Sequence, residues 1–193
     1  MGEVEGQVRN ERLDAEREAR RRAALAQVRQ YPDTVLRMEA RDVEEVDDSV
    51  RTLVERMTRL MQEALGVGLA ATQVGILRRV LVYQTEEEEP PHALVNPRIT
   101  ASSEEQAVED EGCLSLGMAG VVVPVERPTA VTVEALSPAG EEVVVQAEGL
   151  EARVIQHEID HLDGVLIIDR TDAEHRREAL GKLRPLPVLA PLT

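Results

Sequence analysis

The stretch that decides the fold is Gln156-His157-Glu158-Ile159-Asp160-His161-Leu162-Asp163-Gly164. We predict a helix over residues 151–162, ended by Asp163-Gly164, with an apolar face made by Val154, Ile155, Ile159 and Leu162. Residues four apart on a helix differ by about 40° in direction, so His157 and His161 point the same way and can bind one divalent cation. Glu158 can reach a water beside that cation. Histidines at this spacing also occur as ordinary surface or core residues, and the pattern alone leaves that alternative open.

Two histidines do not complete a metal site, and the sequence offers two candidates for the third ligand. Cys113, the only cysteine, stands in Glu111-Gly112-Cys113-Leu114-Ser115, where Gly112 permits close backbone approach. A thiolate is a good ligand for zinc or ferrous iron, and a set of two imidazoles and one thiolate leaves one tetrahedral position open, which is typical of a catalytic site. A zinc metallopeptidase of the His-Glu-x-x-His type would instead recruit a later residue, such as His175. A non-catalytic metal-binding protein is the third alternative, but it needs no Glu158 beside an open position.

A third feature is the segment Gly66-Val67-Gly68-Leu69-Ala70-Ala71-Thr72-Gln73-Val74-Gly75. Its glycines permit tight backbone contacts. The segment lacks the Lys-Ser/Thr pair of a phosphate loop, and a helix is predicted before it where a dinucleotide fingerprint needs a strand, so nucleotide binding is excluded. Gln73 is a neutral donor that can stabilise an oxyanion, and it gains this meaning only together with the other two motifs.

Composition narrows the class of protein further. The chain has 193 residues, 22 basic and 37 acidic, for a formal net charge of −15. This charge argues against broad binding to nucleic acid or anionic lipid, and we expect no specific DNA partner and no membrane association. Tyr31 and Tyr83 are the only aromatic residues apart from histidine, which disfavours base-stacking surfaces. One cysteine allows no internal disulfide, and the charged N-terminal stretch is unlike a secretory signal, so we expect a cytoplasmic protein.

The order of the predicted elements indicates an α+β fold. After a mixed-charge helix over Glu11–Arg22, expected to be solvated or partner-dependent, a helix starts at the caps Asp47 and Asp48 and stops at Gly66. Strands are predicted over residues 79–84, 93–96, 121–125, 130–136, 141–148 and 165–169, and a polar helix over about 172–183. We divide the chain into a charged N-terminal extension over 1–30, a single domain over 31–184 and a Pro-rich tail over 185–193.

Taken together, the three motifs resemble peptide deformylase. The matching segments are Gly66–Gln73, Glu111–Ser115 and Gln156–Gly164, in the order found in the family, and weaker similarity spans about residues 30–170. The resemblance implies antiparallel sheets around a central metal-binding helix and one divalent metal per chain, Fe²⁺ natively with Zn²⁺ or Ni²⁺ able to replace it. It also implies hydrolytic removal of the formyl group from the N-terminal formylmethionine of newly synthesised polypeptides.

The resemblance also assigns roles to individual residues. Cys113, His157 and His161 would be the metal ligands, and Glu158 would take a proton from the metal-bound water and pass it to the leaving amine. The Gln73 amide and the Leu114 backbone N–H would hold the oxyanion. The substrate would bind along Val67, Gly68 and Gly112, with its methionine side chain against Leu150 and Val154. Glu111 and Arg127 would pair to brace the Cys113 loop, and Asp160 would orient a ligand or the helix end.

Two features limit what the resemblance carries over. The family often has Pro-Gly soon after Cys-Leu-Ser-x, whereas Leu116-Gly117-Met118-Ala119-Gly120 follows here, so the shape of the outer substrate pocket does not transfer. The terminal helix carries Arg176, Arg177, Lys182 and Arg184 against Asp172, Glu174 and Glu178, a balance that attracts RNA only weakly. We therefore expect ribosome contact to be weak and transient.

Overall fold

The computed structural model describes residues 15–183, so residues 1–14 and the predicted tail over 185–193 lie outside the described part of the chain. The helical elements are α1 (Ala15–Leu25), η1 (Thr34–Arg37), α2 (Asp48–Glu63), η2 (Ala71–Val74), η3 (Gly117–Ala119), α3 (Gly149–Leu162), α4 (Ile167–Arg170) and α5 (Ala173–Leu183). The strands are β1 (Gly68–Ala70), β2 (Val80–Tyr83), β3 (His92–Ser102), β4 (Gln106–Gly112), β5 (Val122–Pro128), β6 (Ala130–Leu136) and β7 (Glu142–Glu148).

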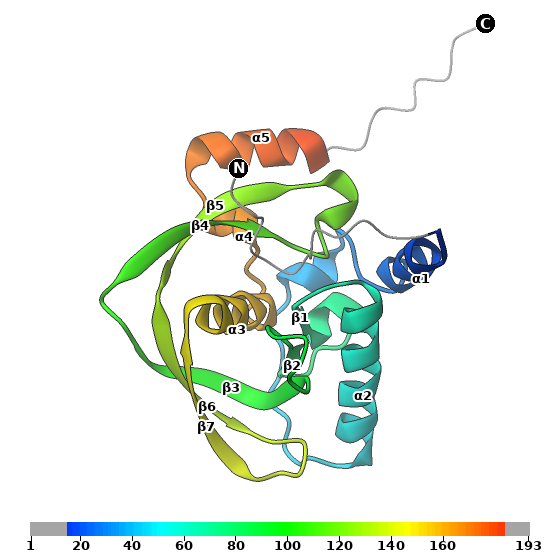
Figure 1. Cartoon of the computed structure of the whole chain (residues 1–193), viewed down its shortest axis with the longest axis vertical. Coiled ribbons are helices and arrows are strands. Elements are labelled where there is room, and N and C mark those ends of the chain that lie inside the picture. The colour runs from blue at the N-terminus through cyan, green and yellow to red at the C-terminus, as the bar shows by residue number, and fades with distance from the viewer. Residues whose placement is uncertain (1–14, 184–193) are drawn as a thin grey trace, which may run out of the picture.

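The strands form two antiparallel sheets with α3 between them. The larger sheet has the order β1-β2-β3-β6-β7, and β4 pairs with β5 in a second, two-stranded sheet. Figure 1 shows α3 in the middle of the molecule, with β3, β6 and β7 on one side of it and β4 and β5 on the other. Every α3 residue from Ala152 to Leu162 is buried. The predicted α+β fold with antiparallel sheets around a central helix is confirmed.

Helix α2 illustrates how local sequence sets an element. The Asp47 side chain accepts a hydrogen bond from the Val50 N–H at 3.0 Å, which caps the first turn as predicted. The helix ends before Gly66, because Leu65 adopts a left-handed conformation with φ +58° and the Gly66 N–H bonds back to the Met61 carbonyl. Its buried face recurs at helical spacing, through Val50, Leu53, Met57, Leu60 and Met61.

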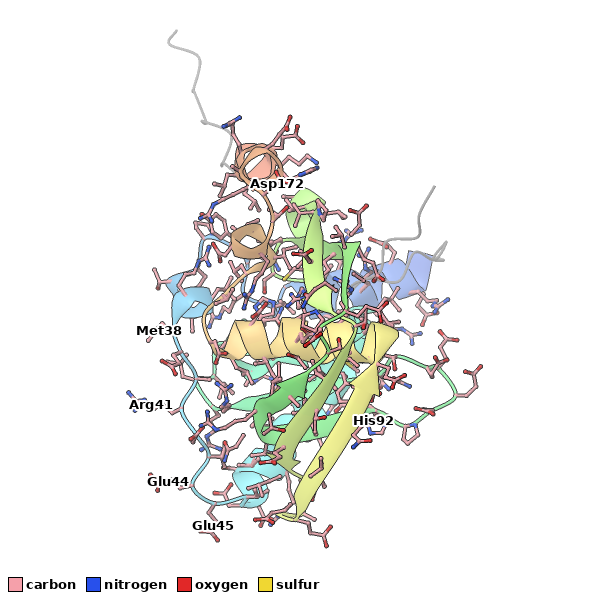
Figure 2. The ribbon with its side chains drawn as sticks, turned by 90° about the vertical axis from the view of Figure 1, so that its left-hand side faces the viewer. Met38, Arg41, Glu44, Glu45, His92 and Asp172 are labelled. Atoms are coloured by element: carbon pink, nitrogen blue, oxygen red, sulfur yellow. The ribbon has the colours of Figure 1, made fainter. Side chains whose placement is uncertain are left out.

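Two strands differ from the sequence prediction. The strand expected to end at Asn96-Pro97 continues to Ser102, because the irregular residues form a bulge between Val95 and Arg98 and do not end the pairing. Asn96, at φ +53°, also holds the outer segment that precedes α2, since its side chain exchanges hydrogen bonds with the Val43 backbone at 2.8 and 2.9 Å. Figure 2 shows Met38, Arg41, Glu44 and Glu45 of that segment on the outside of the molecule. Strand β4 was not among the predicted strands, because its three consecutive acids, Glu109, Asp110 and Glu111, are unlike the apolar pattern of a strand.

The strand predicted over residues 165–169 is wrong, since residues Ile167–Arg170 form the short helix α4. The Asp169 carboxylate accepts a hydrogen bond from the Leu166 N–H at 2.9 Å and pairs with Arg37, and both contacts favour a helical turn. The predicted polar helix at the C-terminal end is confirmed as α5, whose Ala179 is buried.

The described part of helix α1 starts at Ala15, and the predicted residues from Glu11 to Asp14 lie outside the described part of the chain. Over residues 16–22 the side chains are exposed or half-buried, as expected for a solvated helix, whereas the next turn is partly buried. Its Ala24, with 1% exposure, and Val28 in the following turn are buried against α2 in the same apolar cluster. The end of the segment that we named an extension therefore contributes to the core, and the division at residue 30 stays a prediction.

Candidate active site

The two histidines of α3 lie one turn apart and face each other, as predicted. Their ring centroids are 5.0 Å apart, and both side chains are almost fully buried. Helix α3 starts where β7 ends, after Glu148 in an extended conformation. The register of this single helix therefore fixes both rings.

Cys113 joins the two histidines from a distant part of the sequence. It follows directly after β4, and its Sγ lies 3.2 Å from His161 Nε2. One ligand atom from each of Cys113, His157 and His161 lies within 4.8 Å of the others, and all three residues are buried. His157 Nε2 is buried without a hydrogen-bond partner within residues 15–183. A thiolate and two imidazoles, one with an unsatisfied nitrogen, fit the donor set of a divalent cation.

Glu158 lies against the backbone of β1. A Cβ atom placed on Gly68 would stand 2.9 Å from both Cγ and Cδ of Glu158, and closer still to its Oε1. Only glycine leaves room for the carboxylate there, so β1 and α3 fit together through this pair. The Glu158 side chain is fully buried, next to a metal-ligating candidate in sequence. Its position suits a group that handles protons in a site shielded from solvent.

Gln73 connects η2 to the Cys113 loop. Its Oε1 accepts a hydrogen bond from the Ala70 N–H at 2.8 Å. Its Nε2 donates to Ser115 Oγ at 3.1 Å and lies 3.8 Å from Cys113 Sγ. The structure thus brings the Gln73 amide, and Leu114 next to Cys113, to the three candidate ligands.

The predicted substrate-binding residues surround the same place. Leu150, Val154 and His157 follow at i, i+4 and i+7 on α3, so they share one helix face. Val67, directly before β1, packs in one apolar cluster with Val154 and the half-buried Leu150. Gly112 is the last residue of β4 and precedes Cys113. The loop that follows, where the family pattern is not kept, forms the turn η3 and ends at Gly120 with φ +60°.

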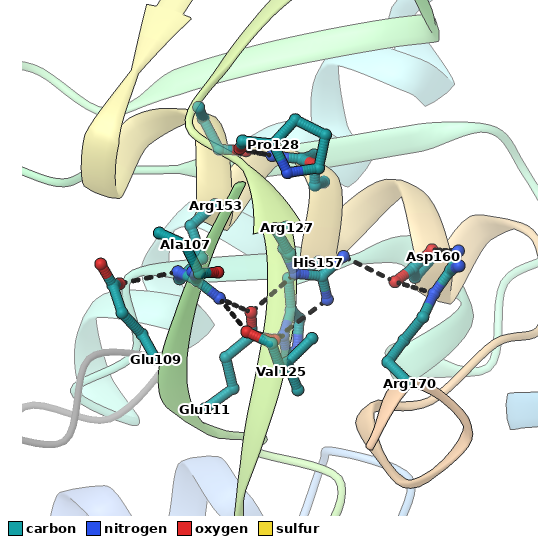
Figure 3. A network of polar contacts seen from close by, with 12 residues as sticks. Ala107, Glu109, Glu111, Val125, Arg127, Pro128, Arg153, His157, Asp160 and Arg170 are labelled. Carbon is teal, nitrogen blue, oxygen red and sulfur yellow. Dashed lines mark hydrogen bonds and ion pairs between the residues drawn. The ribbon is translucent and has the colours of Figure 1, made fainter. Parts of the chain in front are cut away.

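A buried ion network lies behind the ligands (Figure 3). The Glu111 carboxylate accepts hydrogen bonds from Arg127 at 2.6 and 3.0 Å, from Arg153 at 2.7 Å and from His157 Nδ1 at 2.9 Å. The expected pairing of Glu111 with Arg127 is confirmed. Because His157 Nδ1 faces Glu111, its Nε2 is the nitrogen turned toward Cys113 and His161.

Sequence reasoning missed the second arginine that bonds to Glu111, which is Arg153. Arg153, one turn before His157, bonds to Glu111, to Glu109 at 2.8 Å and to the carbonyls of Val125 and Ala107. Asp160 binds no candidate ligand directly and instead pairs with Arg127 at 2.9 Å and with Arg170 at 2.5 Å. The position of Arg153 on the same helix face as His157 was the available signal, because an arginine there needs buried acidic partners.

The pKa values of the two histidines are shifted in opposite directions. Burial alone would lower the pKa of His157, but the Cys113 sulfur and the charges of Glu111 and Glu158 raise it to about 10. Burial lowers the pKa of His161 well below its ordinary value, and the positive His157 lowers it further. Burial would likewise raise the pKa of Glu111, but His157 and Arg127 hold it well below its usual range. Binding of a cation to both rings would therefore release a proton from His157.

Comparison with known proteins agrees with this geometry. The family model for polypeptide deformylase matches residues 25–177. The chain belongs to the polypeptide deformylase family. The peptide deformylase of Natranaerobius thermophilus is 46% identical over 156 residues, which cover 80% of this chain and 97% of the relative. The crystal structure of peptide deformylase from Ehrlichia chaffeensis superimposes with a TM-score of 0.76 at 35% identity, covering 81% of this chain and 93% of the other.

As a deformylase, the chain is a hydrolase that removes formyl groups from the N-termini of new polypeptides. The peptidase alternative is not supported, because His175 lies on α5 with its side chain exposed and bonded to Asp172. It is not part of the Cys113, His157 and His161 group. Between residues 15 and 183, no helix has the length and apolar character that a membrane crossing would require.

Proposed function

We propose that this deformylase holds one divalent cation on the Cys113 sulfur and on one ring nitrogen each of His157 and His161. The observation that carries the proposal is the convergence of these three ligand atoms within 4.8 Å. Sulfur and imidazole donors accept Fe²⁺, Zn²⁺ and Ni²⁺ alike. We take Fe²⁺ as the native metal because the family resemblance implies it. When bound, the cation supplies Lewis acidity, which lowers the pKa of a water and polarises the formyl oxygen.

Glu158 is the proton carrier in this proposal. Its buried carboxylate accepts a proton from the attacking water and gives it to the departing amine of methionine. Its position against Gly68 supports the role, because the carboxylate then lies beside the strand along which the substrate would bind. A displaced carboxylate could not accept a proton from the water and then donate it to the amine.

Gln73 and Leu114 bind the oxyanion. The Gln73 Nε2 donates to Ser115 and lies near Cys113, so it points toward the ligand group. The Leu114 backbone N–H follows Cys113 directly. Donors held in place before the reaction stabilise the developing charge, and one such donor is worth about 3–4 kcal/mol.

The peptide substrate adds a strand to the free edge of β1. Strand β1 is at the edge of the five-stranded sheet, and the Val67 carbonyl already accepts from the Gln84 N–H of the β2 side at 2.9 Å. Because backbone groups of an antiparallel strand alternate in direction, the Gly68 N–H and C=O face the free side. In this proposal the substrate also contacts Gly112, and its methionine side chain fits against Val67, Leu150 and Val154.

The natural substrates are nascent formylmethionyl polypeptides in the cytoplasm. The catalytic unit spans residues 31–184, between the N-terminal extension and the tail over 185–193. The exposed basic residues of α5 are balanced by acidic neighbours, which supports only weak and transient ribosome contact. A salt-sensitive sedimentation assay with ribosomes tests that contact.

Formyl-Met-Ala-Ser and measured metal content test the proposal. We expect Glu158→Gln to abolish deformylation while metal is retained, and Cys113→Ser to lose the metal. His175→Ala is the matched control and leaves both unchanged. Wild-type turnover in Glu158→Gln, or metal loss in His175→Ala alone, would refute the assignment. Metal analysis after anaerobic purification identifies the native cation.

A further inference from the structure

The segment between α1 and η1 forms hydrogen bonds to both parts of the chain that carry the proposed oxyanion donors. These parts are η2, with Gln73, and the Cys113 loop, with Leu114. The Arg29 N–H donates to the Gln73 carbonyl at 2.7 Å, and the Tyr31 N–H donates to the Ser115 carbonyl at 3.0 Å. Between them, the Gln30 side-chain Nε2 donates to the Leu114 carbonyl at 3.0 Å. Three consecutive residues, which we call the strap (29–31), therefore span from η2 to the Cys113 loop.

The strap is anchored at its N-terminal side. Ala24 and Val28 are 1% and 4% exposed and pack in the apolar cluster that includes Met57 and Met61 of α2. The Gln30 amide also contacts the Val28 carbonyl at 3.3 Å, which limits the conformations open to this side chain. The strap is thus fixed to the core before it reaches the site, so it can transmit that rigidity to the residues that it contacts.

A hydrogen bond joins η2, which carries Gln73, directly to the loop that carries Leu114, but catalysis would weaken it. This link runs from Gln73 Nε2 to Ser115 Oγ, and it uses the same amide group that must donate to the oxyanion. When that amide turns to the substrate, the spacing between Gln73 and Leu114 needs a support that the reaction does not consume. The strap bonds go to backbone carbonyls, which the oxyanion does not use.

We propose that Gln30 is a positioning residue that sets the distance between the Gln73 and Leu114 donors through the Leu114 carbonyl. The inference rests on the proposed function, in which these two groups bind the oxyanion. It gives the N-terminal segment before Tyr31 a part in the reaction through its hydrogen bond to the Leu114 carbonyl. A displacement of about 1 Å at such a site costs up to about 10²-fold in rate.

The test compares Gln30→Leu, which fills similar space without a donor, with Gln30→Lys, which keeps one. We expect Gln30→Leu to lower kcat for formyl-Met-Ala-Ser by about tenfold, with KM and bound metal unchanged, because only the transition state uses the oxyanion donors. Gln30→Lys should restore most of the rate. The matched control is Gln27→Leu, the same change at an exposed position three residues earlier, and it should have no effect.

A second readout does not depend on turnover. In NMR spectra, the backbone amide signal of Leu114 and the side-chain amide signal of Gln73 should shift in Gln30→Leu and stay in place in Gln27→Leu. Wild-type kcat and unshifted signals in Gln30→Leu would overturn the inference and leave the proposed function intact. An equal loss in Gln30→Leu and Gln30→Lys would also overturn it. A wild-type chain without deformylase activity would instead remove the proposed function itself.

Discussion

Replacing Glu111 by glutamine keeps the shape of the side chain and removes its charge from the centre of the ion network. Glu111 has no exposed surface and accepts four hydrogen bonds, from Arg127, Arg153 and His157. A neutral amide has one oxygen and one NH₂ group, so its NH₂ must face at least one of these donors. The substitution therefore leaves buried positive charge without its partner.

The expected loss is large compared with the stability of a domain. Removing one member of a buried ion pair costs about 3–5 kcal/mol. A domain has about 5–15 kcal/mol of free energy of unfolding in total. Because Glu111 also orients the His157 ring through Nδ1, we expect metal affinity to fall by about 10–100-fold as well.

Urea unfolding of the metal-free protein, followed by circular dichroism, measures the stability term, and titration of the apoprotein with Zn²⁺ measures the affinity. Glu109→Gln is the matched control, since Glu109 lies on the same strand and pairs with the same Arg153 at 2.8 Å but is 40% exposed. Because water reaches the Glu109 carboxylate and screens its charge, we expect its loss to cost less than the loss of the Glu111 charge. Equal unfolding free energies for Glu109→Gln and Glu111→Gln would refute the reasoning.

Two further perturbations follow from contacts of single residues. Gly68→Ala should lower kcat/KM by about 10²-fold, because the new Cβ would displace the Glu158 carboxylate. Gly117→Ala should be neutral, since among the described residues nothing beyond the neighbours of Gly117 in the chain lies within 4 Å of the added Cβ. Similar rates for the two variants would count against the placement of Glu158. Burial would raise the pKa of Asp169, but hydrogen bonds from Arg37 and Leu166 hold it below its ordinary value, so its stabilising effect is present above about pH 4 and is lost as the pH falls through the lowered value. Calorimetry should therefore show that Arg37→Met lowers Tm at neutral pH and that this difference shrinks as the pH falls through the lowered pKa of Asp169. A difference independent of pH would contradict the assignment.

The sequence was most informative where the interacting residues belong to one helix and its cap. His157 and His161 lie on the same helix, so the period of 3.6 residues was enough to predict that the two rings meet. Asp47 capped α2 as expected for the same reason, since the capping side chain and the Val50 N–H that donates to it are three residues apart. Predictions of this kind need no knowledge of the tertiary structure.

Other features depend on partners far away in the chain. Strand β4 carries Glu109 and Glu111, which are tolerated next to the core because Arg153 of α3 neutralises both. The run before Arg170 is apolar and short, a pattern that suits a strand or a buried helix equally well. Contacts with Arg37, more than a hundred residues earlier, favour the helix, and no local pattern contains that information.

The place of α3 along the chain affects how the enzyme is made. Within residues 15–183, all seven strands are translated before residue 149, and only α4 and α5 come after α3. Until α3 leaves the ribosome, no helix packs between the two sheets, and the imidazoles of His157 and His161 are absent. A polypeptide truncated before α3 by stalled translation is thus inactive and exposes the apolar faces of its sheets. In the complete protein, the packing of α3 completes the core and the candidate active site in the same step.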